Sequence, residues 1–204
     1  MLWSQANSVV EELRSETLLY LPPLSTRRGF SSSRVEHLLN RLVKAMPATE
    51  AYLEVGTLEG RTLEAAANGN DDKQLYGVDP GDKYGVVPEP FTPNIVMYKS
   101  SWQQFLKEVS PPLPIGACFY DADHSAEQTF DFMDKVEGFM ADEAVLVLDD
   151  WDRASVRQGA FRAGHHWTLL REMPEYSGNE PRQGSPNYFG YSFGVSVWGF
   201  KRNP

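Results

Sequence analysis

The amino-acid sequence predicts an α/β fold in which helices cross over a parallel sheet. Short apolar runs alternate with helical patterns from residue 51 to residue 148, and this alternation is typical of parallel sheets. Several of the apolar runs end in acidic residues, as strands do when their carboxyl ends line a ligand crevice. The 204 residues, with 41% hydrophobic and 23% charged side chains, have the size and composition of one globular domain.

Proline residues and polar loops divide the chain into short predicted elements. Apolar residues that recur every three or four positions indicate helices, and short runs rich in Val, Leu, Phe and Tyr indicate buried strands. The predicted helices cover residues 4–19, 34–46, 62–67, 102–109, 130–140 and 153–165. The predicted strands cover residues 51–55, 74–78, 95–98, 115–120, 144–148 and 193–200, and residues 167–173 form either a strand or a short helix. Residues 25–33, 81–93 and 175–187 are predicted to be loops.

The charge and the composition argue against several classes of protein. A net charge of -9 disfavours a nucleic-acid backbone as the partner, because proteins that bind one need a basic face. No run of 18 apolar residues is present, so no membrane span is predicted. The single cysteine, Cys118, lies in an apolar run, and the acidic N-terminal segment does not resemble a secretory signal. We therefore expect a cytoplasmic protein that binds neither nucleic acid nor membrane.

Two clusters of aspartates follow directly on predicted strands. One consists of Asp121, Asp123 and His124, and the other of Asp149 and Asp150. Carboxylates just past the ends of parallel strands converge in one crevice, where a divalent cation would keep them ionised despite their mutual repulsion. A histidine beside them can carry a proton near neutral pH. The pattern suggests metal-assisted chemistry on a hydroxyl group, and the alternative is a polar turn in which Asp123 caps the following helix.

A second motif lies upstream, where a strand containing Glu54 leads into a turn with Gly56 and Gly60. Glycines in such a turn let the backbone approach a cofactor closely. The next strand ends in Asp79, 23 residues after Gly56, near the spacing of roughly 20 at which an acidic residue accepts hydrogen bonds from ribose hydroxyls. The turn lacks the G-x-G-x-x-G pattern of nicotinamide sites, and Glu54 suits a cationic ligand better than a pyrophosphate.

The order of these motifs resembles the class I S-adenosylmethionine-dependent methyltransferases. Residues 119–124 are similar to the D-A-D-K segment of cation-dependent O-methyltransferases that act on catechols and caffeoyl esters. They are equally similar to the D-G-D-x-Y and D-x-x-H segments of the sugar O-methyltransferases of macrolide and aminocoumarin biosynthesis, and residues 147–151 are similar to the D-D or D-N pair of both groups. The resemblance implies a Rossmann-like three-layer sandwich with a mostly parallel seven-stranded sheet and an antiparallel C-terminal strand.

The resemblance also implies a role for each motif residue. Eight residues would bind S-adenosylmethionine: Glu54, Gly56, Thr57, Gly60, Asp79, Ser101, Trp102 and Asp121. Asp121, Asp149 and Asp150 would bind Mg2+, and their oxygen ligands suit Mn2+ or Ca2+ as well. His124 falls on the position of the general base, and Asp123 is the competing base.

The function that the resemblance implies is methyl transfer to a hydroxyl group of a small molecule, such as a sugar or a catechol. The alternatives are an oxidoreductase or hydrolase on the same fold and a non-catalytic nucleoside-binding module. We expect one domain over residues 1–204, with residues 1–47 as an N-terminal helical cap, residues 48–152 as the core that binds cofactor and metal, and residues 153–204 completing the sheet and the substrate side. The Tyr- and Trp-rich C-terminal segment could form a homodimer interface.

Overall fold

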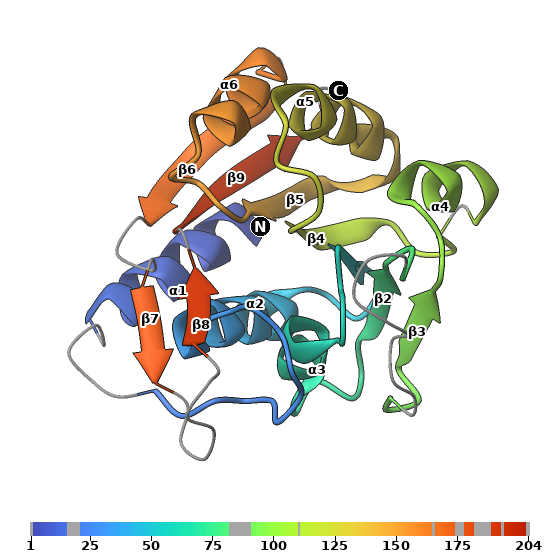
Figure 1. Cartoon of the computed structure of the whole chain (residues 1–204). Coiled ribbons are helices and arrows are strands. Elements are labelled where there is room, and N and C mark those ends of the chain that lie inside the picture. Colours follow the sequence, from blue (N-terminus) through green and yellow to red (C-terminus); the bar gives the residue numbers. More distant parts are fainter. Residues whose placement is uncertain are drawn as a thin grey trace.

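A seven-stranded sheet forms the middle layer of the protein, as seen in a computed structural model that describes residues 2–15, 21–81, 91–109, 111–164, 166–173, 178–181, 189–192 and 194–202. The strand order is β3-β2-β1-β4-β5-β9-β6 (Figure 1). Strand β9 runs antiparallel to both of its neighbours, β5 and β6, and the other neighbouring strands pair parallel. The predicted α/β architecture with an antiparallel C-terminal strand is therefore confirmed. The strands are β1 (Ala51–Val55), β2 (Gln74–Val78), β3 (Ile95–Tyr98), β4 (Ile115–Tyr120), β5 (Met140–Leu148), β6 (Trp167–Met173) and β9 (Val195–Lys201).

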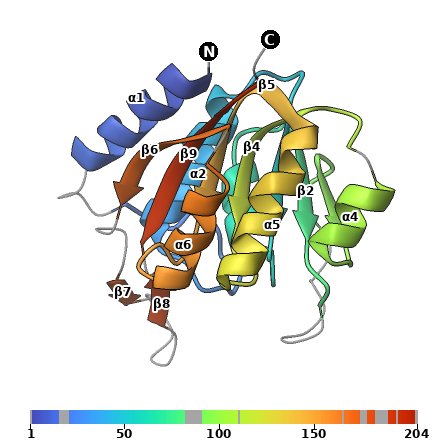
Figure 2. The same ribbon diagram turned by 90° about the horizontal axis from the view of Figure 1, so that it is seen from above.

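Helices cover both faces of this sheet and complete the three layers (Figure 2). One face carries α1 (Leu2–Ser15), α2 (Ser33–Ala45) and α3 (Arg61–Ala67), and the other carries α4 (Trp102–Glu108), α5 (Ala126–Val136) and α6 (Ala154–Arg162). Within the described residues, no helix is both long enough and apolar enough to span a membrane.

Two hydrophobic cores lie on the two faces of the sheet. In β1, Tyr52 belongs to the core under α1–α3, whereas its neighbour Leu53 belongs to the core under α4–α6. Phe119 and Tyr120 divide in the same way in β4. Successive side chains of a strand point to opposite faces, so strands buried on both faces are apolar throughout rather than alternating. This is why the sequence shows continuous apolar runs here.

Three elements differ from the sequence-based predictions. The helix predicted over residues 130–140 is α5, which begins at Ala126 because Ser125 caps it by accepting a hydrogen bond from the Gln128 backbone N–H. It ends at Val136, and Met140 already begins β5. Part of the predicted loop 175–187 forms the strand β7 (Gly178–Pro181), which pairs with β8 (Phe189–Ser192) in a separate two-stranded sheet. The remainder of that loop and Phe193 lie outside the described residues.

The strand order places a topological switch point between β1 and β4. From β1 the chain proceeds through β2 to β3 on one side, and from β4 it proceeds to β5 on the other. Helices from opposite faces therefore diverge at this point and leave a crevice above the carboxyl ends of the strands. The predicted site residues lie at these strand ends.

Candidate functional site

Four strands end in the same row, and each is followed by one of the predicted site residues. The register pairs Val55 of β1 with Val78 of β2 and with Tyr120 of β4, and it pairs Tyr120 with Leu148 of β5. The residues that follow these strand ends are Gly56, Asp79, Asp121 and Asp149.

Backbone hydrogen bonds extend the parallel ladder by one residue at this row. Gly56 donates to the Val78 carbonyl over 2.9 Å, Asp121 donates to Val55 over 2.9 Å, and Asp149 donates to Tyr120 over 3.1 Å. The row is therefore fixed by the sheet itself, and the side chains that follow it project from a rigid edge.

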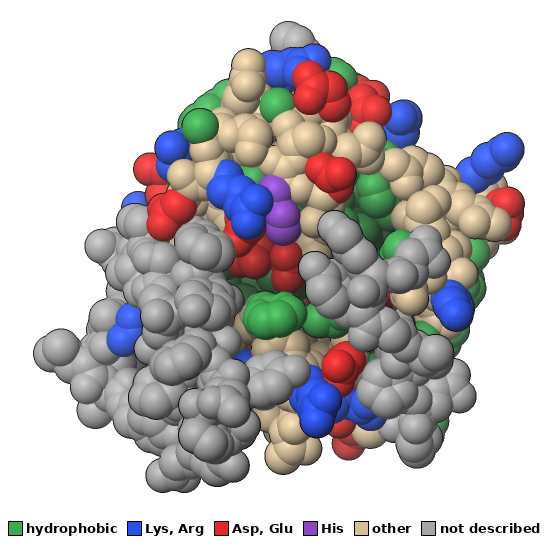
Figure 3. Space-filling view, viewed as in Figure 1, with side chains coloured by type: hydrophobic (Ala, Val, Ile, Leu, Met, Phe, Trp, Pro, Cys, Tyr) green, Lys and Arg blue, Asp and Glu red, His purple; other side chains and the backbone are tan. Residues whose placement is uncertain are grey.

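A pocket of about 930 Å³ opens above this row of strand ends. On the face shown in Figure 3, acidic side chains gather around a histidine in a hollow, with apolar side chains exposed beside them. The pocket brings together the predicted site residues from five segments of the chain, with Glu54 and Gly60 as the exceptions. The predicted site residues that line it are Gly56, Thr57, Asp79, Ser101, Trp102, Asp121, Asp123, His124, Asp149 and Asp150.

Gly56 and Asp79 shape the turn between β1 and α3. Gly56 has a φ of 88°, and a Cβ at this position would collide with the carbonyl oxygen of Asp121. Asp79 accepts hydrogen bonds from two backbone N–H groups, those of Leu58 at 2.8 Å and Gly81 at 2.7 Å. Leu58 itself has a φ of 51°, which non-glycine residues rarely adopt. Asp79 thus holds the loop whose residues line the pocket.

Glu54 lies beneath the pocket and does not line it. Its carboxylate is fully buried and accepts hydrogen bonds from the Tyr52 hydroxyl at 2.9 Å and the Thr62 hydroxyl at 2.8 Å. Burial raises the pKa of Glu54 to about 8, although both hydroxyl groups lower it. Thr62 lines the pocket, and its hydroxyl group connects Glu54 to the pocket wall.

Ser101 and Trp102 form the start of α4 at the rim of the pocket. The Ser101 hydroxyl caps the helix by accepting a hydrogen bond from the Gln104 backbone N–H. Trp102 is 5% exposed and packs edge-on against Phe132 of α5, with ring centroids 5.4 Å apart. Its ring is therefore a fixed wall of the pocket.

Asp121, His124 and Asp149 form the cluster that is suited to a metal ion. Each offers one ligand atom, and these atoms all lie within 4.8 Å of one another. Burial, together with the negative charges of Asp121 and Asp150, raises the pKa of Asp149 well above its ordinary value. The His124 Nε2 atom is buried without a hydrogen-bond partner, although Asp121 Oδ1 lies 3.4 Å away. Such a group of repelling carboxylates and an orphaned nitrogen fits a cation.

Asp150 lines the pocket next to this cluster and forms an ion pair with Arg153. Its Oδ2 atom forms an ion pair with Arg153 Nε at 2.5 Å and lies 3.5 Å from His124 Nδ1. Its backbone φ is 52°, a left-handed conformation that non-glycine residues rarely adopt. The three-residue cluster of the described chain consists of Asp121, His124 and Asp149, and Asp150 lies beside it. The role of Asp150 as a metal ligand stays a prediction.

Asp123 holds the turn after β4. Its Oδ1 atom accepts a hydrogen bond from the Ser125 backbone N–H at 2.8 Å, and its carbonyl accepts one from the Tyr120 hydroxyl at 2.9 Å. Asp123 is exposed and lines the pocket. Ser125, rather than Asp123, caps α5, so the alternative of Asp123 as the helix cap is wrong in detail.

The structure adds pocket residues that the sequence did not indicate. Gly29, Phe30 and Ser31, from the predicted loop 25–33, line the pocket together with Arg61 of α3. The loop could be recognised as polar, but no periodicity indicates where its side chains point. Only the tertiary structure brings it to the glycine turn.

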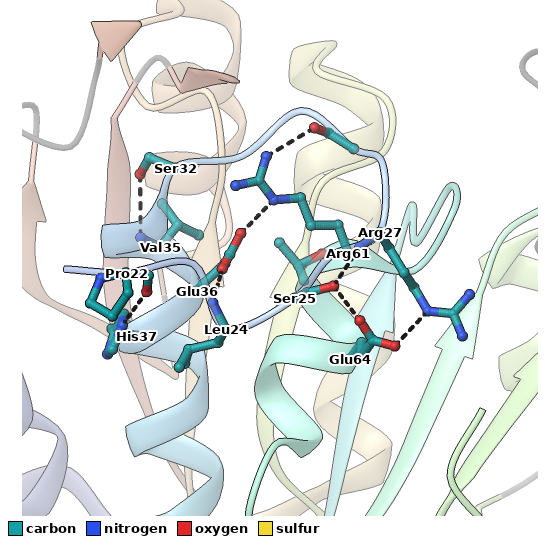
Figure 4. A network of polar contacts seen from close by, with 12 residues as sticks. Pro22, Leu24, Ser25, Arg27, Ser32, Val35, Glu36, His37, Arg61 and Glu64 are labelled. Carbon is teal, nitrogen blue, oxygen red and sulfur yellow. Dashed lines mark hydrogen bonds and ion pairs between the residues drawn. The ribbon is translucent and has the colours of Figure 1, made fainter. Parts of the chain in front are cut away.

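A buried polar network fixes this loop in place (Figure 4). Glu36 of α2 is fully buried and forms an ion pair with Arg61, and it accepts a hydrogen bond from the Leu24 backbone N–H at 2.7 Å. Arg61 also donates to the Gly29 carbonyl at 3.2 Å. Glu64 of α3 binds the Arg27 side chain at 2.9 Å. These contacts attach the loop to α2 and α3.

Comparisons with known proteins agree with this geometry. The profile of the family described as "Methyltransferase domain" matches residues 53–151. No curated protein sequence matches the chain significantly. The O-methyltransferase from Bacillus cereus in complex with SAH is 14% identical with a TM-score of 0.59, over 98% of this chain and 91% of that one. The O-methyltransferase TomG from Streptomyces achromogenes, involved in tomaymycin synthesis and solved with SAM, is 16% identical with a TM-score of 0.58, over 98% and 90%.

The profile match and the fold lead to the same family. The match runs from β1 through the aspartate pair after β5 and so includes the whole row of strand ends that forms the pocket floor. The two solved structures share the fold over nearly the whole chain. In its matched core and its fold, the chain resembles the class I S-adenosylmethionine-dependent methyltransferases.

Proposed function

We propose that this protein is an S-adenosylmethionine-dependent, divalent-metal-assisted O-methyltransferase that acts on a hydroxyl group of a small molecule. The observation that carries the proposal is the position of the Asp121, His124 and Asp149 cluster in the same pocket as the glycine turn. A cofactor subsite beside a metal cluster is the arrangement that brings a methyl donor and a coordinated hydroxyl together.

The cofactor side of the pocket suits a nucleoside that carries a positive charge. Gly56 allows the ligand to approach the backbone, and Asp79 offers carboxylate oxygens at the end of β2, where ribose hydroxyls would bind. Trp102 supplies a flat apolar wall for a base. Bound there, S-adenosylmethionine supplies the electrophilic methyl group, and these residues orient it.

The residues of the cluster are chemically suited to a divalent ion. Asp121 and Asp149 supply hard oxygen ligands. Burial and then the negative charge of Asp121 raise the pKa of Asp149, and a cation would offset both effects. A divalent ion in this cluster supplies Lewis-acid chemistry that eases deprotonation of an acceptor hydroxyl. Mg2+ is favoured by the carboxylate oxygens, whereas a His124 ligand would favour Mn2+.

His124 has two candidate roles, and they exclude each other in one turnover. As a base, its buried Nε2 accepts the proton that leaves the acceptor hydroxyl, while Asp150 lies beside Nδ1 and stabilises the charged ring. As a metal ligand, the same nitrogen completes the cluster with Asp121 and Asp149. Asp123 is the competing base, and its Oδ1 atom already accepts a hydrogen bond from the Ser125 backbone N–H.

Calorimetric titration with S-adenosylhomocysteine, with and without Mg2+, tests the cofactor part of the proposal. We expect micromolar binding to the wild type and its loss in Asp79→Ala, because that variant removes the proposed ribose acceptor and releases the Leu58 loop. Asp71→Ala is the matched control, since Asp71 is an exposed aspartate that does not line the pocket. Absence of binding to the wild type under both conditions would sink the proposal.

Titration with Mn2+, followed by the electron paramagnetic resonance of the free ion, tests the metal part. Asp149→Asn should weaken binding at least tenfold. His124→Gln separates the two roles of the histidine. If His124 is the base, the variant retains Mn2+ affinity and loses methyl transfer; if it is a ligand, both are lost. Unchanged Mn2+ binding in Asp149→Asn would refute the proposed metal site.

A further inference from the structure

Phe30 is an exposed aromatic residue inside the pocket. Three large hydrophobic residues are exposed among the described ones, namely Phe30 at 51%, Phe161 at 58% and Val96 at 38%. Of these, Phe30 alone lines the pocket that holds the glycine turn and the acidic cluster. A phenylalanine ring left half in water forgoes much of the stabilisation that burial provides, unless a ligand covers it.

The backbone on both sides of Phe30 is held in place. Arg61 donates a hydrogen bond to the Gly29 carbonyl, and Arg61 is itself fixed by its ion pair with the fully buried Glu36. On the other side, Ser31 and Ser32 are buried, and the Ser32 hydroxyl caps α2 by binding the Val35 backbone N–H. The ring is therefore presented to the pocket by an ordered segment.

The charges of the pocket disfavour an anionic partner for this ring. Among the residues that the structure describes, five aspartates and two arginines line the pocket. Arg61 is paired with Glu36, and Arg153 is paired with Asp150. A bound divalent ion would offset part of the negative charge, but the described lining residues have no surplus of positive charge with which to select a carboxylate or phosphate.

We infer that Phe30 is a specificity-determining residue, whose ring stacks on the flat apolar face of an uncharged aromatic acceptor with hydroxyl groups. This inference rests on the proposed function and selects between its two acceptor classes. An aromatic diol would place its edge hydroxyls at the acidic cluster and its ring face on Phe30. A sugar can also lay a C–H face on a phenylalanine ring, but its puckered ring makes less contact with Phe30 than a planar aromatic ring does.

The test is calorimetric titration of the protein saturated with S-adenosylhomocysteine and Mg2+, using catechol, 3,4-dihydroxybenzoate and methyl glucoside as probes. We expect catechol to bind more tightly than the other two. Phe30→Ala should weaken catechol binding by about tenfold, as loss of an aromatic pair and its contact area predicts. Phe30→Tyr, which keeps the ring, should restore it, and S-adenosylhomocysteine should bind all variants within about twofold.

Phe161→Ala is the matched control, because Phe161 is equally exposed but packs against Trp151 and Trp198 away from the pocket. Phe161→Ala should leave the affinities for catechol and for S-adenosylhomocysteine unchanged. Tighter binding of methyl glucoside than of catechol, or equal catechol binding by Phe30→Ala, would overturn the inference while the proposed function stands. Weakened S-adenosylhomocysteine binding by Phe30→Ala would assign the ring to the cofactor and also overturn it. If S-adenosylhomocysteine does not bind the wild type, the proposed function and this inference fail together.

Discussion

The ion pair between Glu36 and Arg61 provides a quantitative test of how the pocket is held together. Glu36 is fully buried and Arg61 is 5% exposed, so neither charge can be solvated if the other is removed. Loss of one partner from a buried pair costs about 3–5 kcal/mol, because the remaining charge stays buried. We expect Arg61→Met to lower the free energy of unfolding by this amount, since methionine keeps most of the volume and removes the charge together with the hydrogen bond to the Gly29 carbonyl.

A second ion pair in the same loop supplies the control. Arg27 and Glu64 lie 2.9 Å apart, but their side chains are 15% and 34% exposed. Arg27 also stacks on Phe91 at 4.0 Å. For such a partly solvated pair we expect Arg27→Met to cost only about 1 kcal/mol, with its contact to Phe91 included.

The assay is urea unfolding of the wild type, both single variants and the double variant Glu36→Leu with Arg61→Met. The double variant should lie within about 2 kcal/mol of the wild type, because no charge is left buried. The remaining losses are the acceptor of the Leu24 N–H and the donor to the Gly29 carbonyl. Similar costs for Arg61→Met and Arg27→Met, or a double variant no more stable than Arg61→Met, would refute the reasoning. Either result would mean that Glu36 is solvated or protonated in the folded protein.

Three further changes have defined outcomes. Gly56→Ala should abolish S-adenosylhomocysteine binding in calorimetry, because its Cβ collides with the Asp121 carbonyl. Gly159→Ala should lower the melting temperature although alanine favours helices, because its Cβ meets the Ala126 carbonyl, whereas Gly138→Ala, which meets no atom within 4 Å, should not. Burial raises the pKa of Glu54 to about 8, so the folded protein holds a proton that the unfolded chain releases at lower pH. The free energy of unfolding therefore falls as the pH rises from the pKa of Glu54 in the unfolded chain toward 8. Urea unfolding between pH 5 and 8 should therefore show a flatter stability profile for Glu54→Gln, differing by about 1.4 kcal/mol per pH unit.

The ends of the central strands could be predicted from the sequence almost to the residue. A strand buried on both faces is an uninterrupted apolar run, and the first polar residue after it marks where the sheet leaves the core. For this reason Asp79, Asp121 and Asp149 could be placed at the edge of the sheet from local pattern alone. Their convergence followed from the parallel order of the strands, which the alternation with helices already implied.

The tertiary structure decided what each side chain does after that edge. Asp150 follows Asp149 directly, yet it adopts a left-handed backbone conformation and forms an ion pair with Arg153. Glu54 turned out to be buried against two hydroxyl groups rather than in the pocket. The position of Phe30 depends on a salt bridge between residues 25 positions apart in the chain. Sequence periodicity reports which face of an element is buried, whereas these contacts join segments whose approach is set by the packing of helices on the sheet, so only the folded chain specifies them.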